Sequence, residues 1–137
     1  MEISVLSEQL MEFYDKISSW EHSVVKGTGL SPAQMHTIEV IGHHQNMRMK
    51  ELAERLAVTT GTLTISVDKL EQKGLVARKP HQSDRRSWLI VLTEKGKEIF
   101  SHHHQLHQNF TDEISHQLSK EELISLSTLL SKVIVRM

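Results

Sequence analysis

Threonine is concentrated in one short stretch of this sequence, at Thr59, Thr60, Thr62 and Thr64, with Gly61 among them. A threonine hydroxyl can bond to a phosphate or to a base edge, and its methyl group can contact the methyl of a thymine. Small side chains at the start of a helix also let the backbone enter the major groove of DNA. The stretch therefore predicts a DNA contact, although threonines can also simply cap a surface helix.

Further polar and basic residues extend this candidate surface. Ser66 and Lys69 follow on the same expected helix, and Lys73 and Arg78 come next, where they could contact phosphates without reading sequence. Residues 48–97 hold eleven Lys or Arg and six Asp or Glu, a net charge of +5. The rest of the chain holds five Lys or Arg and eleven Asp or Glu, a net charge of −6. This asymmetry predicts one surface that faces phosphates.

A second basic group lies in a segment poor in helix signals, at Asp84, Arg85 and Arg86. The aspartate could hold one guanidinium in place while the other reaches a minor groove or a phosphate. A surface ion pair with no further role is the alternative.

Histidine is unusually frequent, with ten residues in the chain. His103 and His107 are four apart on an expected helix and could donate two nitrogens to one metal ion. His36, His22 or Glu39 could supply a third ligand, and three imidazoles would suit zinc, copper or nickel. Alternatively, these histidines only form hydrogen bonds within a dimer.

Catalytic motifs are missing from the sequence. It has no cysteine nucleophile, no G-x-S-x-G, no glycine-rich phosphate loop and no H-E-x-x-H. Glu39 and His43 are four apart and could pair as acid and base, but many surface pairs do so. We therefore expect no enzyme activity and no required cofactor.

Hydrophobic periodicity predicts the elements that position these residues. An early helix should open at Ser31-Pro32 and turn Met35, Ile38 and Ile41 inward. Residues 49–96 should form a winged DNA-binding arrangement. It should begin with a helix, a tight turn and a second helix that ends at Lys73-Gly74. Two paired strands should follow at 75–79 and 87–92, with 80–84 as the hairpin tip. A long helix should then begin at Thr93 and run to about Leu118.

The two ends of the chain predict a partner. Residues 3–24 place apolar side chains at alternating steps of three and four, and a last helix that opens at Ser119 with a capping box has a similar stripe. Helices of this kind are buried together in a homodimer. The predicted fold is mainly α with a small β-hairpin wing (α+β). Residues 1–137 form one domain, with a winged helix-turn-helix lobe at 31–96 and dimerisation helices at 1–30 and 97–137.

The sequence gives no sign of a membrane. Acidic residues stand near the N-terminus where a secretory signal would be basic, and no apolar run approaches the ~20 residues that span a bilayer. Since the chain also lacks cysteine, we expect a cytoplasmic protein.

One spaced pattern resembles a known family. D-x-R, five residues and then L-T-x-x-G, here Asp84, Arg86, Leu92, Thr93 and Gly96, is similar to the wing of the MarR family of dimeric winged helix-turn-helix regulators. The resemblance covers essentially the whole chain. It implies a transcriptional repressor that binds a palindromic operator in double-stranded DNA as a homodimer.

Two longer strings, QMHTIEVIG at 34–42 and VTTGTLTISVDKLEQKG at 58–74, are most similar to FabT-type repressors of bacterial fatty-acid synthesis. This similarity implies long-chain acyl groups on acyl carrier protein as the corepressor. A cavity between the dimer helices and the DNA lobe would hold such a ligand or another small effector. Its candidate residues, each of which also suits ordinary core, are Phe13, Ile17, Trp20, His36 and Phe110.

The chain also resembles zinc-sensing MarR relatives, which use a histidine at the position of His36 and a histidine pair on the long helix. It departs from them with Met35 in place of an acidic ligand and with no cysteine. A zinc site formed by His36, His103 and His107 therefore remains an alternative. A protein of another functional class is a further alternative: a helical module that binds another protein rather than DNA.

Overall fold

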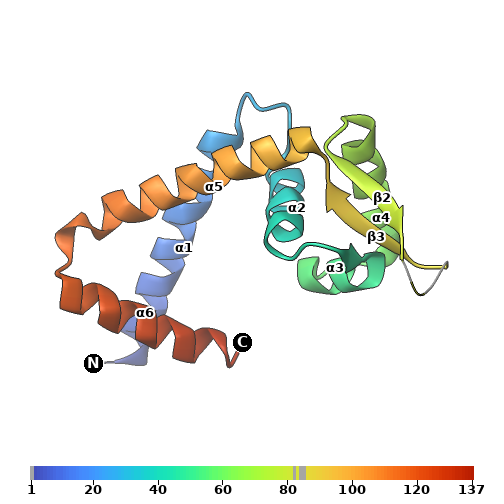
Figure 1. The fold of residues 1–137 in the computed structure, drawn as a ribbon. Helices are drawn as coiled ribbons and strands as arrows, with labels where there is room; N and C mark the ends of the chain where they lie inside the picture. Colours follow the sequence, from blue (N-terminus) through green and yellow to red (C-terminus); the bar gives the residue numbers. More distant parts are fainter. Residues whose placement is uncertain (1, 82, 84–85) are drawn as a thin grey trace. The chain divides into compact units, whose positions relative to one another are not determined.

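The computed structural model describes residues 2–81, 83 and 86–137, and the chain divides into two compact units, Met1–Phe100 and Ser101–Met137. The elements run along the chain as α1 (Ile3–Val25), α2 (Pro32–His43), β1 (Met47–Arg48), α3 (Met49–Leu56), α4 (Thr60–Gln72), β2 (Val76–Pro80), β3 (Trp88–Leu92), α5 (Glu94–Ile114), a 3-10 turn (Ser115–Gln117) and α6 (Lys120–Ile134) (Figure 1). Helices with one small sheet confirm the predicted fold class.

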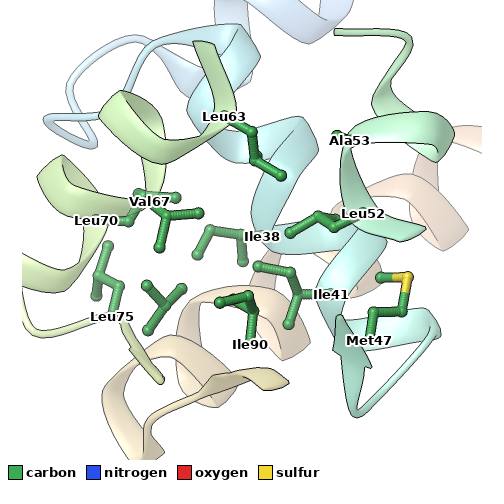
Figure 2. Packing of buried hydrophobic residues seen from close by; sticks show 11 residues of the cluster. Ile38, Ile41, Met47, Leu52, Ala53, Leu63, Val67, Leu70, Leu75 and Ile90 are labelled. Atoms are coloured by element: carbon green, nitrogen blue, oxygen red, sulfur yellow. The ribbon is translucent and has the colours of Figure 1, made fainter. Parts of the chain in front are cut away.

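The core of the first unit lies among α2, α3, α4 and the sheet. Met35, Ile38 and Ile41 of α2 are fully buried, as their spacing predicts. Figure 2 shows Leu63 and Val67 of α4 close to Ile38. The buried cluster consists of Ile38, Ile41, Met47, Leu52, Ala53, Leu63, Val67, Leu70, Leu75, Val76 and Ile90.

The sheet is antiparallel and has three strands in the order β1-β3-β2. β2 and β3 pair as the expected hairpin, with Val76 opposite Leu92 and Pro80 opposite Trp88. The strand β1, in which Met47 pairs with Ile90, was not predicted from the sequence. Two residues are too few to show an alternating pattern, and this strand forms only because β3 offers a free edge.

Helix ends follow the predicted side-chain signals. Ser31 accepts a hydrogen bond from the Gln34 N–H while the Gln34 side chain accepts from the Ser31 N–H, with Pro32 at the first helical position. Ser119 forms the same capping box at the start of α6. α5 ends at Ile114, earlier than the predicted Leu118, and the chain continues as a 3-10 turn.

The L-T-x-x-G string connects the hairpin to α5. The Thr93 hydroxyl donates to the Gly74 carbonyl at 2.6 Å and accepts from the Gly96 N–H at 3.1 Å, so it caps the helix. The Thr93 N–H donates to the Leu75 carbonyl at 3.0 Å. A Cβ on Gly96 would overlap that same Leu75 oxygen. The motif therefore fixes the first turn of α5 against the backbone that precedes β2.

The first and last helices each expose apolar side chains. On α1, Leu10 is 51% exposed and Phe13 is 49% exposed, and on α6, Leu130 is 42% exposed and Val133 is 56% exposed. Among the described residues, no helix is both long enough and apolar enough to cross a lipid bilayer.

Candidate nucleic-acid interface

The threonine stretch forms the N-terminal end of α4. Thr59 is the N-cap: its hydroxyl accepts from the Thr62 N–H at 3.1 Å and donates to the Thr62 hydroxyl at 3.0 Å. The Thr64 hydroxyl donates to the Thr60 carbonyl at 2.7 Å. All four residues are exposed. A hydroxyl that already donates one hydrogen bond still has acceptor lone pairs, so this end of α4 can meet donors on a ligand.

Gly61 is exposed in the first turn of α4 without a packing reason to be glycine. A Cβ at this position would have only the Thr59 hydroxyl nearby, at 3.9 Å. Alanine is a better helix former than glycine. Packing therefore does not require glycine at position 61, and the bare backbone there can closely approach a partner surface.

Ile65 belongs to the same surface, and the sequence motifs did not predict it as a site residue. Its side chain is 61% exposed, although it lies in the middle of a helix whose other apolar side chains are buried in the core. That face is formed by Leu63, Val67 and Leu70. Since Ile65 does not share their spacing, its outward direction could have been found from the helical period.

Some basic residues predicted to contact phosphate hold the lobe together instead of projecting freely. Arg78 on β2 donates to Asp68 at 2.5 Å and to Glu71 at 2.8 Å, both on α4, and its side chain is only 24% exposed. Lys73 Nζ donates to the Gly29 carbonyl at 2.5 Å. Two Arg78 N–H groups are thus engaged by carboxylates, and a phosphate contact by Arg78 stays a prediction.

Ser66 and Lys69 lie further along α4. Ser66 is half-buried and Lys69 is exposed. Their predicted contacts with the DNA backbone also stay predictions.

The structure describes both strands of the wing and part of its tip. Asp84 and Arg85, with the predicted ion pair between aspartate and arginine, lie outside the described residues. Arg86 is exposed just before β3. At the tip end of the hairpin, directly after β2, His81 Nε2 lies 3.0 Å from Arg48 Nη2. This contact connects the hairpin to the start of α3, so the wing and the helix pair belong to one lobe.

The histidine pair of α5 comes together within the second unit. The Nε2 atoms of His103 and His107 lie 3.0 Å apart, which confirms that they share a helix face. His36 is exposed on α2, in the first unit. The complete three-histidine set therefore stays a prediction.

The predicted effector residues are likewise divided between the units. Phe13 on α1 is exposed, Ile17 and Trp20 are half-buried, and Phe110 belongs to α5 in the second unit. An effector site formed by these residues stays a prediction.

Comparisons with known proteins agree with this arrangement. The sequence profile of the MarR family matches residues 30–88. The regulator BilQ of Clostridium symbiosum is 32% identical over 111 residues, which are 81% of this chain and 77% of BilQ. The regulator MhqR of Bacillus subtilis is 29% identical over 124 residues, 90% of this chain and 86% of MhqR. Both are helix-turn-helix transcriptional regulators.

Among solved structures, Streptococcus pneumoniae FabT in complex with DNA superimposes with a TM-score of 0.87 and 29% sequence identity. The match covers 97% of this chain and 95% of FabT. The likeness therefore extends over the helices at both ends as well as the lobe with the threonine surface.

Proposed function

This chain belongs to the MarR family of transcriptional regulators, and from that premise we propose that it is a homodimeric repressor whose α4 binds the major groove of a palindromic operator. The observation that carries the proposal is the N-terminal end of α4. There a threonine surface surrounds a glycine that packing does not require. Small side chains and bare backbone suit close approach to base edges.

Each subunit would contribute one half of the contact. Thr60, Thr62 and Thr64 would lie in a major groove, and Arg85 or Arg86 of the wing would reach the adjoining minor groove. In this proposal residues 31–96 bind DNA, and residues 1–30 and 97–137 dimerise. Two identical lobes would read half-sites about 34–36 Å apart.

The test is Gly61→Ala, with binding measured by fluorescence anisotropy on duplex DNA from upstream of the protein's own coding sequence. We expect operator affinity to fall at least about tenfold, since loss of a close base contact costs about 1–3 kcal/mol. The thermal midpoint should stay or rise, because alanine stabilises a helix by roughly 0.5–1 kcal/mol relative to glycine.

Ser127→Ala, a small exposed substitution on α6, is the matched control and should leave operator affinity unchanged. Unchanged affinity in Gly61→Ala would contradict the placement of α4 in the groove. A protein-interaction module, the alternative from another class, would bind random duplex weakly and without the steep salt dependence of phosphate contacts.

We further propose that the regulated genes serve fatty-acid synthesis and that long-chain acyl-acyl carrier protein is the corepressor. The similarity to FabT supports this assignment. Addition of the acylated carrier protein should strengthen operator binding, and the unacylated carrier protein is the control. A stronger complex only with the unacylated protein, or with neither, would contradict the assignment.

Regulation by zinc is the second candidate, and the 3.0 Å approach of His103 to His107 favours it. In that case zinc alone should strengthen operator binding, and His103→Gln should abolish the response while the operator affinity without metal stays the same.

A further inference from the structure

One apolar side chain lies at the centre of the exposed face of α4. Ile65 is 61% exposed, while Leu63 and Val67, two residues before and after it, are buried. At about 100° per residue, a step of two residues turns the helix through about 200°, so Ile65 points almost directly away from the core. The face that carries the threonines is therefore not wholly polar, because an isoleucine projects from its middle.

The residues one helical turn from Ile65 leave its side chain accessible. Gly61, four residues before it, has no side chain, and Lys69, four residues after it, is exposed. Thr62, three residues before it, is also exposed. Residues three or four apart lie on the same side of a helix. Ile65 thus has bare backbone on one side and a cation on the other, within a segment that carries a net positive charge.

The fold does not explain why this position holds isoleucine. A single apolar residue on a protein surface is common and needs no explanation by itself. Isoleucine is, however, a poorer helix former than leucine, lysine or glutamate, so the helix gains nothing from it. The informative feature is its place on the face of α4 that is proposed to enter the major groove. There Ile65 presents an apolar group with no hydrogen-bonding capacity to a base edge.

We propose that Ile65 determines part of the operator sequence by contacting the C5-methyl group of a thymine in each half-site. This inference rests on the proposed function, in which α4 lies in the major groove. Thymine is the only one of the four DNA bases with an apolar group on its major-groove edge, and apolar side chains recognise it through that methyl group. The bare backbone at Gly61 allows the close approach that a contact of such short range requires.

Deoxyuridine in place of thymine tests the contact, because it pairs with adenine in the same way and lacks only the methyl group. The duplex is the shortest fragment from upstream of the protein's own coding sequence that retains full affinity. Thymines are replaced in symmetry-related pairs, and fluorescence anisotropy gives each dissociation constant. For the unsubstituted protein, one pair of replacements should weaken binding roughly fifteenfold, because burial of one methyl group contributes about fourfold and two independent contacts multiply.

Ile65→Ala identifies the side chain that contacts the methyl group. Alanine is a good helix former, so the exposed substitution should leave the fold intact. The variant should bind the thymine duplex more weakly, and the critical pair of deoxyuridines should change its affinity less than about twofold. Thr62→Ser is the matched control, because it removes a methyl group from a neighbouring side chain on the same face. Whatever its own affinity, it should keep the roughly fifteenfold response.

Two results would overturn the proposal. One is a full response to deoxyuridine in Ile65→Ala, and the other is the absence of any thymine pair at which deoxyuridine weakens binding by the unsubstituted protein. Absence of specific duplex binding would overturn the proposed function as well. Specific binding without coupling between Ile65 and a thymine methyl would overturn this inference alone.

The salt dependence separates this contact from contacts with phosphates. Operator affinity should fall steeply between about 50 mM and 200 mM salt, because phosphate contacts release counterions. The ratio of the affinities for the thymine and deoxyuridine duplexes should stay constant, because a contact between two apolar groups releases none. A ratio that falls in parallel with the affinity would overturn the proposal.

Discussion

At the scale of single residues, glycine has two opposite roles in the first turns of two helices. Gly96 has no room for a side chain, because a Cβ would overlap the Leu75 carbonyl. Gly61 has open space around its Cα. The first glycine is therefore required by packing, while the second is available to a partner.

Gly96→Ala should be strongly destabilising. The added methyl must displace backbone, so we expect the free energy of unfolding to fall by about 1–3 kcal/mol, the usual cost of overpacking. Urea denaturation followed by circular dichroism measures the change. Gly61→Ala is the matched control and should unfold at an equal or higher urea concentration. If both variants lost the same stability, the close packing at Gly96 would not explain its effect.

At the scale of elements, the capping box at the start of α6 affects the protonation of one carboxyl group, that of Glu122. The Glu122 side chain accepts from the Ser119 backbone N–H at 2.9 Å, and the Ser119 hydroxyl accepts from the Glu122 N–H at 3.1 Å. These hydrogen bonds, with the backbone bond first, lower the pKa of Glu122 below its ordinary value. The charged carboxylate is the form that the helix end stabilises.

A titration of α6 should show the direction of this effect. The pKa of Glu122 is lower in the folded chain than in the unfolded chain. The ionised carboxylate therefore stabilises the folded state at pH values above the unfolded pKa, and this stabilisation is lost as the pH falls through the folded pKa. NMR of the Glu122 carboxyl carbon should give a lower midpoint in the folded chain than in urea. Ser119→Ala should bring the folded midpoint closer to the urea value. A folded midpoint at or above the urea value would contradict the capping assignment.

The attachment of β2 to α4 also belongs to this scale. Arg78 contacts Asp68 and Glu71, which lie one helical turn apart on α4. The bridge connects the proposed recognition helix to the wing.

At the scale of the whole molecule, the exposed apolar helices favour a dimer. Leu130 on α6 is 42% exposed, and buried leucine contributes about 1.5–3 kcal/mol. Leu130→Lys should therefore raise the dimer dissociation constant at least about tenfold in sedimentation equilibrium. Thr128→Lys introduces the same side chain on the opposite side of α6 and should leave the dissociation constant nearly unchanged. Equal effects of the two variants, or none, would place the dimer contact elsewhere.

From its own patterns, the sequence predicted most helices, their caps at Ser31, Thr93 and Ser119, the hairpin and the family resemblance. These features depend on periodicity and on hydrogen bonds between residues three or four apart, which neighbouring residues specify. Only the tertiary structure decided the strand β1 and the pairing of Arg78 with α4. Their residues are brought together from separate elements, and no local pattern encodes which side chains converge when those elements pack.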